Sequence, residues 1–204
     1  MFVAAKYLKC MGVALAFFAA AFCASSASAS EAFMQTGGLT SQPIGHYEFC
    51  KRLPAECSVK SRNVMPEKMT HDFWQLIVNV NSNANRKIKP LTDMDIYGVE
   101  EYWAYPDTVG DCEDYVLLKR RDLMQAGISP ANLLITVVRK PDGEGHAVLT
   151  VRTDKGDFVL DNLVEGVKNW SETDYTYLKR QAANNTGRWV SIEAPSNILV
   201  GSVQ

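Results

Sequence analysis

The stretch GDCEDY at residues 110–115 places a cysteine at the start of a predicted helix, and the expected fold is built around this helix. Asp111 is a favourable N-cap residue, and the two acids after the cysteine suit the positive end of the helix dipole. Gly127 is a good residue just beyond a helix, and Pro130 prevents continuation. The unsatisfied backbone N–H groups of a first helical turn favour an anion, which lowers the pKa of a thiol there. The sequence therefore predicts a helix that begins at Asp111 or Cys112 and carries a candidate nucleophile.

Three strand candidates follow this helix, separated by tight-turn sequences, PDG at 141–143 and KGD at 155–157. The predicted strands cover residues 133–139, 146–153 and 158–163. Consecutive strands joined by short turns form an antiparallel meander. The pattern predicts an α+β domain in which the cysteine-bearing helix packs on an antiparallel sheet.

His146 opens the second strand and Asp161 lies on the third, so cysteine, histidine and aspartate follow one another along the chain. This order suits a nucleophile, its base and the group that orients the base. The imidazole would take the thiol proton, and the carboxylate would fix the tautomer and stabilise the imidazolium. We predict Cys112, His146 and Asp161 as the catalytic residues.

The expected register leaves a gap between two of these residues. A simple hairpin that pairs Asp154 with Asp157 places Asp161 opposite Thr150, on the same face as His146 but not opposite it. A β-bulge or a strong twist is then needed to bring the carboxylate to the imidazole.

The first 29 residues have the pattern of a secretory signal peptide. Lys6 and Lys9 form a short basic start, residues 11–24 are uncharged, and residues 27–29 are small enough for a signal peptidase. The uncharged run is too short to span a bilayer. We predict cleavage after Ala29, a single mature domain at residues 30–204 and a periplasmic location.

Cysteine usage follows from this export prediction, because nearby cysteines pair under oxidising conditions. Cleavage removes Cys10 and Cys23. Cys50 and Cys57 enclose a short loop, and we predict a disulfide between them. Cys112 is then an unpaired thiol in an oxidising compartment, which needs a functional reason.

Each predicted catalytic residue also has a plain structural interpretation. A cysteine at a helix start is often a small buried apolar residue, a histidine can cap a strand, and Asp161-Asn162 can form a turn. Export and the order of the three residues favour the catalytic interpretation.

The remaining sequence predicts further elements. Residues 30–69, rich in Gly, Pro and Ser, predict an irregular lead segment, and Thr70 is predicted to cap an amphipathic helix ending near Arg86. Residues 87–110 are aromatic and acidic without clear periodicity, which predicts either a binding wall beside the active site or a loop packed by its own aromatics. A polar helix and a last short strand are predicted at residues 170–185 and 188–193.

Composition excludes several classes of protein. The 204 residues are 47 % hydrophobic and 22 % charged, which fits one globular domain and not a disordered chain. A formal net charge of -2 argues against a nucleic-acid-binding protein, which needs a basic face. No long uncharged apolar run follows the first 30 residues, so we predict no transmembrane segment in the mature chain.

Three motifs resemble signatures of the bacterial transglutaminase-like cysteine proteinases: GDCEDY at 110–115, HAVL at 146–149 and LDN at 160–162. Two further segments resemble that family, YLKRQ at 177–181 and RWV at 188–190. The similarity covers most of the chain, from about residue 50 to residue 192. It implies a papain/transglutaminase-like core in which Cys112, His146 and Asp161 form the triad.

The resemblance also implies partners and a cation. Adhesin-releasing members of the family act in the periplasm, where they cut large surface adhesins and so release biofilm cells. The resemblance also implies an inner-membrane regulatory receptor as a partner. They depend on calcium through acids flanking the nucleophile, here Asp111 and Glu113, and hard oxygen ligands suit Ca²⁺. The same acids also fit as simple helix caps. The shorter chain and the pair Cys50 and Cys57 resemble a rhizobial-type branch, for which an adhesin substrate does not follow.

The sequence as a whole predicts an exported thiol hydrolase that cuts a peptide bond of an envelope or surface protein through an acyl-enzyme. The chemistry itself requires no cofactor, and calcium is an additional expectation. Two alternatives stay open. The same triad could pass the acyl group to an amine or deamidate a glutamine, as a transglutaminase does. The domain could also be a non-catalytic module that binds a protein through residues 97–105.

Overall fold

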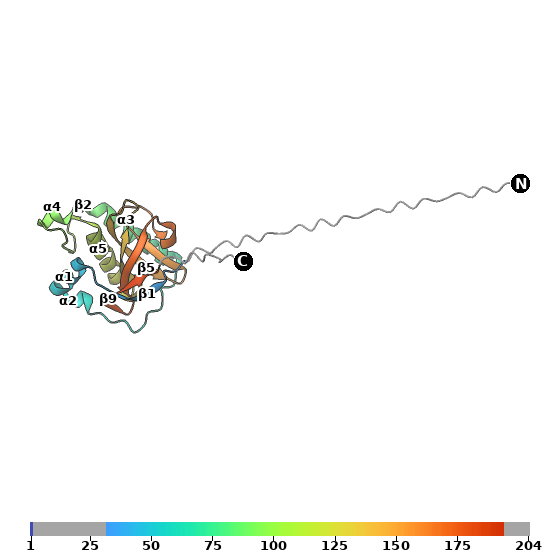
Figure 1. The fold of residues 1–204 in the computed structure, drawn as a ribbon, viewed down its shortest axis with the longest axis horizontal. Coiled ribbons are helices and arrows are strands. Elements are labelled where there is room, and N and C mark those ends of the chain that lie inside the picture. Colours follow the sequence, from blue (N-terminus) through green and yellow to red (C-terminus); the bar gives the residue numbers. More distant parts are fainter. Residues whose placement is uncertain (2–31, 194–204) are drawn as a thin grey trace, which may run out of the picture.

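A seven-stranded sheet forms the centre of the computed structural model, which describes Met1 and residues 32–193 (Figure 1). Its strand order is β1-β9-β8-β4-β5-β6-β7, and every neighbouring pair is antiparallel. The strands are β1 (Thr36–Thr40), β4 (Leu133–Arg139), β5 (Gly145–Thr153), β6 (Gly156–Leu160), β7 (Lys168–Asn169), β8 (Thr176–Ala182) and β9 (Asn185–Ile192). The expected meander β4-β5-β6 is therefore confirmed as part of a larger sheet.

The α-helices of the described residues lie between β1 and β4 along the chain. They are α1 (Ile44–Arg52), α2 (Pro54–Cys57), α3 (His71–Lys87), α4 (Asp93–Tyr97) and α5 (Cys112–Gln125). Two short elements complete this part of the chain, β2 (Lys89–Pro90) and β3 (Val109–Gly110), which pair in parallel. The predicted helix after Thr70 is confirmed: the threonine Oγ1 accepts from the backbone N–H of Phe73 at 3.1 Å. The predicted α+β class is confirmed as well.

Helices α3 and α5 cover one face of the sheet and form the main core with it. This cluster includes Phe73, Ile77, Val116, Leu117, Leu123, Leu133, Ile135 and Leu149. Burial of each leucine side chain stabilises the fold by about 2 kcal/mol. On the opposite face a smaller cluster contains Val138, Val148, Val159, Trp170 and Tyr177. Neighbours such as Val148 and Leu149 thus serve different cores, as the two-residue period of a strand requires.

Two predicted elements were wrong. The lead segment 30–69 is not wholly irregular, because it contains β1, α1 and α2. The polar helix predicted at 170–185 is replaced by a 3₁₀ turn, η2 (Trp170–Glu172), and by β8. Asn169 and Glu172 form a capping box at η2, while β8 pairs with β4 and β9 on its two sides. Pairing on both edges overrides the helix-favouring composition of residues 178–182.

The predicted register of β5 and β6 was also wrong. Thr153 pairs with Gly156, so the loop is Asp154-Lys155, and Leu149 pairs with Leu160. Gly156 has φ +131°, and an added Cβ would lie 2.6 Å from the carbonyl oxygen of Ala32. The glycine is therefore required at the first position of β6 rather than in the loop. This register carries Asp161 two positions nearer to His146, and no bulge is needed between β5 and β6.

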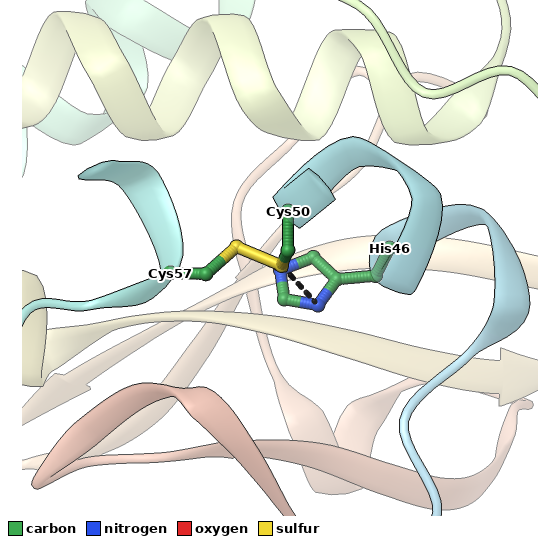
Figure 2. Close-up of side chains that lie close together, drawn as sticks. All are labelled: His46, Cys50 and Cys57. Atoms are coloured by element: carbon green, nitrogen blue, oxygen red, sulfur yellow. Dashed lines mark hydrogen bonds between the residues drawn. A yellow bond between two sulfur atoms is a disulfide. The ribbon is translucent and has the colours of Figure 1, made fainter. Parts of the chain in front are cut away.

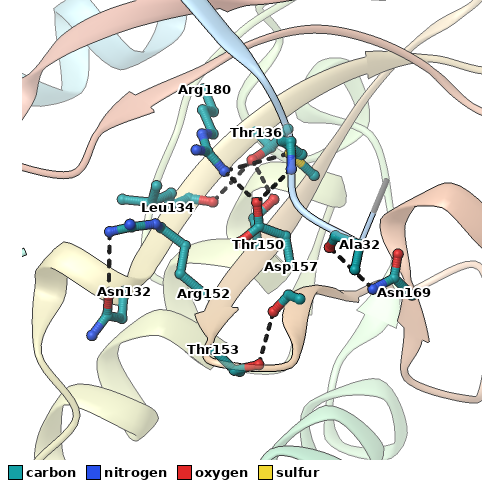
Figure 3. A network of polar contacts seen from close by, with 12 residues as sticks. Ala32, Asn132, Leu134, Thr136, Thr150, Arg152, Thr153, Asp157, Asn169 and Arg180 are labelled. Atoms are coloured by element: carbon teal, nitrogen blue, oxygen red, sulfur yellow. Dashed lines mark hydrogen bonds and ion pairs between the residues drawn. The ribbon is translucent and has the colours of Figure 1, made fainter. Parts of the chain in front are cut away.

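A polar network holds the helix-free face of the sheet together (Figure 3). Arg180 of β8 forms an ion pair with Asp157 of β6 at 3.0 Å, and Asp157 also accepts from the backbone N–H of Met34 at 2.9 Å. The hydroxyls of Thr136 and Thr150 bond across β4 and β5 at 2.6 Å. These contacts fix β6 and β8 relative to one another, and Asp161 directly follows β6.

No helix among the described residues is long and apolar enough to cross a membrane. The predicted signal peptide at residues 1–29, with Cys10 and Cys23, lies outside the described part of the chain except for Met1.

Candidate active site

Cys112 is the first residue of α5 and lines two cavities, one of about 360 Å³ and one of about 310 Å³. His146 and Gly145 also line both cavities, so the two meet at the cysteine and histidine. The structure therefore brings Cys112 and His146 to one site, although they lie on different elements. Among the described cysteines Cys112 is the free one.

His146 and Asp161 form a buried pair. His146 Nε2 donates to Asp161 Oδ1 at 2.9 Å, and the two side chains are each 3 % exposed. Burial opposes the ionisation of Asp161, but hydrogen bonds from His146 and Tyr175 hold the pKa of this carboxyl below its usual value. With Nε2 donating to the carboxylate, Nδ1 is the nitrogen left to accept a proton.

The Cys112 thiol is not activated in this arrangement. Its Sγ donates to Glu113 Oε2 at 2.9 Å. Burial, and then the charge of Glu113, raise the pKa of the thiol well above its usual value. The predicted lowering of this pKa at the helix start was therefore wrong, because burial and Glu113 outweigh the helix dipole. The thiol has to leave Glu113 before it can ionise toward His146.

An acidic cluster surrounds the start of α5. Carboxylate oxygens of Asp93, Asp111 and Glu113 lie within 4.8 Å of one another. Burial raises the pKa of Asp111 to about 6 and of Glu113 to about 9, with neighbouring acids adding to both shifts. The Oδ1 atoms of Asp93 and Asp111 are buried and have no hydrogen-bond partner. A buried set of unpartnered carboxylate oxygens fits a hard divalent cation.

Two of the acids differ from their sequence-based roles. Asp111 occupies the N-cap position, but its side chain makes no capping hydrogen bond. Asp114 is buried, accepts from the backbone N–H of Ala104 at 2.8 Å, and has its pKa raised to about 8, chiefly by burial. Asp93, which sequence reasoning missed, is on α4; its Oδ2 accepts from the backbone N–H of Tyr102. The Thr92 cap of α4 is the sequence signal that could have located it.

Residues 87–110 border the site, as one of the two interpretations predicted. Leu91 and Thr92 line the larger cavity, and Glu101 and Trp103 line the smaller one. The aromatics of this segment also pack on one another, with the Tyr97 and Tyr102 ring centroids 4.4 Å apart. Both interpretations therefore hold for different side chains.

The structure places a disulfide between Cys50 and Cys57, with a Cα–Cα distance of 5.6 Å (Figure 2). His46 lies against it: its Nδ1 is 3.6 Å from Cys50 Sγ, and its Nε2 is 3.8 Å from Cys57 Sγ. Burial, and then the charge of Arg120, lower the pKa of His46 to about 4. The neutral ring contacts Trp103 at a centroid distance of 5.3 Å, so the disulfide braces one wall of the smaller cavity.

Comparison with known proteins gives one family and related structures. A family model described as bacterial transglutaminase-like cysteine proteinase matches residues 36–197. The calcium-bound structure of Legionella pneumophila LapG is 25% identical, with a TM-score of 0.50, over 64% of this chain and 76% of that one. Two further structures of the same protein, one of them EGTA-treated, are 27% identical, with TM-scores of 0.49, over 61% of this chain and 69% of theirs. No curated protein matches. The match to calcium-bound LapG agrees with the expected transglutaminase-like core.

Proposed function

Since this chain belongs to the bacterial transglutaminase-like cysteine proteinases, we propose that it is an exported periplasmic peptidase with Cys112, His146 and Asp161 as its triad. The observation that carries the proposal is the hydrogen bond from His146 Nε2 to Asp161 in a site where His146 and Cys112 line the same two cavities. This arrangement leaves His146 Nδ1 free to take the thiol proton. The proposed nucleophile lies on α5, the proposed base on β5, and the orienting carboxylate on the residue that directly follows β6.

The reaction follows from these roles. His146 accepts the proton of the Cys112 thiol, and the thiolate attacks the carbonyl carbon of the scissile peptide bond. The imidazolium then donates its proton to the leaving amine, which leaves an acyl-enzyme on the sulfur. Water, deprotonated by His146, attacks the thioester and restores the thiol. Asp161 keeps the imidazole in the tautomer with its proton on Nε2 throughout.

Calcium is the second part of the proposal. Asp93, Asp111 and Glu113 would hold the ion through carboxylate oxygens, and the related LapG has a calcium-bound structure. When bound, Ca²⁺ supplies positive charge that offsets these acids beside the thiol. The support in this chain is the pair of buried, unpartnered oxygens on Asp93 and Asp111. Asp93→Asn should weaken Ca²⁺ binding in calorimetry, whereas Asp95→Asn on the exposed side of α4 should not.

The substrate is a protein segment that enters the two cavities lined by Cys112 and His146. We extend the proposal to an envelope or surface protein, with a large adhesin as the first candidate and an inner-membrane receptor as regulator. The support for both is the family membership. Comparing the envelope proteomes of cells with the wild-type protein and with Cys112→Ala would identify the substrate.

Purified chain tests the chemistry directly. Mature wild type, residues 30–204, should be labelled by an iodoacetamide probe and should cleave the identified substrate, whereas mature Cys112→Ala should do neither and should keep the same circular dichroism spectrum. Adding a primary amine separates hydrolysis from acyl transfer, because a transglutaminase would incorporate the amine into its product. Normal cleavage by Cys112→Ala would end the proposal.

A further inference from the structure

Tyr175 makes two contacts with the His146–Asp161 pair that the sequence did not reveal. Its hydroxyl donates to Asp161 Oδ2 at 2.5 Å. Its ring meets the His146 imidazole edge-on, with a centroid distance of 5.6 Å and an interplanar angle of 62°. Tyr175 follows η2 and directly precedes β8, so the two elements that replaced the predicted helix bring it to this position.

Asp161 is held at both oxygens. Oδ1 accepts from His146 Nε2 and from the backbone N–H of Leu163, each at 2.9 Å, and Oδ2 accepts from Tyr175. The carboxylate is therefore fixed in its plane as well as in its position. Without the tyrosine hydroxyl, Oδ2 would lose this side-chain donor.

The surroundings give the carboxylate room to turn. Asp161 and Tyr175 both line a cavity of about 120 Å³, whose wall also includes Val159 and Lys168. A carboxylate that turns toward this cavity would weaken the linear hydrogen bond to His146 Nε2. The hydroxyl of Tyr175 is the side-chain contact that opposes this rotation.

We propose that Tyr175 is a positioning residue of the active site, which holds Asp161 against His146 and limits rotation of the imidazole. This inference rests on the proposed triad. Tyr175 lines neither of the two cavities at Cys112; it acts through its contacts with Asp161 and His146. Its loss would reduce the fraction of molecules in which His146 Nδ1 faces the thiol, and binding of substrate would be unaffected.

Tyr177 offers a matched control two residues along the chain. Its hydroxyl bonds to Thr173 at 2.9 Å, and its ring packs against Trp170 at 5.2 Å, in the core of the helix-free face. Tyr175→Phe and Tyr177→Phe each remove one hydroxyl near the same end of β8. Only the first removes a hydrogen bond to Asp161.

Kinetics on the identified substrate give the first readout. Tyr175→Phe should lower kcat about tenfold with KM unchanged, the scale expected for one lost hydrogen bond to a charged group. Tyr177→Phe should keep the wild-type kcat. Equal losses in both variants, or a loss in Tyr175→Phe that appears only in KM, would overturn the inference.

A spectroscopic readout separates this inference from the proposed function. In a Cys112→Ala background, the proton between His146 Nε2 and Asp161 should give a downfield NMR signal. Tyr175→Phe should shift or broaden that signal, and Tyr177→Phe should leave it in place. An unchanged signal in Tyr175→Phe would refute the positioning role while leaving the triad intact. Full activity of Cys112→Ala would instead refute the triad, whatever the tyrosine variants do.

Discussion

Lys119 is an unusual residue for the centre of the helix that begins with Cys112. It lies on α5, is 0 % exposed, and its Nζ has no hydrogen-bond partner among the described residues. Its Nζ lies 5.6 Å from the centroid of the Tyr115 ring. Burial lowers its pKa to about 7, although the charge of Asp161 acts in the opposite direction. The side chain is therefore neutral in the folded protein at alkaline pH, while the unfolded chain still binds its proton up to the usual lysine pKa.

This difference predicts a pH-dependent cost that Lys119→Met removes. Above about pH 10.5 both states are neutral at this position, so the cost is absent. As pH falls from there to about 7, the unfolded state gains a proton that the folded state does not bind, and wild type loses about 1.4 kcal/mol per pH unit relative to the variant. Below pH 7 the difference is constant. Urea unfolding of both proteins from pH 6 to 10 measures it.

Lys87→Met is the control for this measurement, because Lys87 is exposed at the end of α3. Its stability difference from wild type should not change with pH. A parallel pH course for wild type and Lys119→Met would mean that Lys119 is not the source of the penalty.

At the scale of elements, Gly156 sets the register between β5, which carries His146, and β6, which leads to Asp161. Gly156 begins β6 with a positive φ and lies against the Ala32 carbonyl, and the resulting Thr153–Gly156 pairing delivers Asp161 to His146. A one-residue change in the position of the turn would move every β6 side chain relative to β5. The geometry of the active site therefore depends on a residue outside it.

Gly156→Ala is expected to destabilise the protein by about 1–3 kcal/mol, because alanine is strained at this φ and its Cβ clashes with backbone. It should also lower kcat by disturbing the delivery of Asp161. Gly166→Ala is the matched control, since its added Cβ meets nothing within 4 Å. Thermal unfolding and substrate cleavage measure the two effects. Equal stability of the two variants would contradict the role assigned to Gly156.

The elements that were predicted correctly are those whose own residues determine their conformation. Apolar residues with a 3.6-residue period after Thr70 predict α3. Asp111 before the helix and Gly127 after it predict the ends of α5. The Thr92 cap could have located Asp93 on a helix, but its place beside Asp111 and Glu113, and the place of Tyr175 beside Asp161, come from contacts between residues distant in the chain. Strand β8 was missed because its pairing partners, not its own residues, determine its conformation.

At the scale of the whole molecule, the lead segment is joined to the sheet by the pairing of β1 with β9 and also by one buried side chain, His46. His46 contacts the disulfide on one side and the ring of Trp189 on β9 on the other, with Trp189 Nε1 donating to Nδ1 at 3.2 Å. The segment that sequence reasoning described as irregular therefore supports both the sheet and the Trp103 wall of the smaller cavity.

Removal of the disulfide by Cys50→Ala with Cys57→Ala is expected to cost about 2.5 kcal/mol of unfolding free energy, from the conformational freedom of the unfolded loop. Without the disulfide, His46 and the Trp103 wall of the smaller cavity should be held less rigidly, which would raise KM more than it lowers kcat. Urea unfolding and steady-state kinetics test both, with Ser58→Ala, an exposed change next to the disulfide, as control. Unaltered stability of the double variant would show that the bond does not constrain the chain.

The two cavities that meet at Cys112 have a consequence for which bonds the enzyme can reach. If the proposed substrate segment occupies both cavities, it presents several consecutive residues in extended form, with their backbone amides released from any helix or sheet. A folded domain cannot do this without local unfolding, which costs several kcal/mol. Linkers and mobile tethers meet the requirement without that cost. On the proposed substrate binding, the conformation of the target would select substrates before their side chains are recognised, and a well-folded neighbour carrying the same local sequence would be spared.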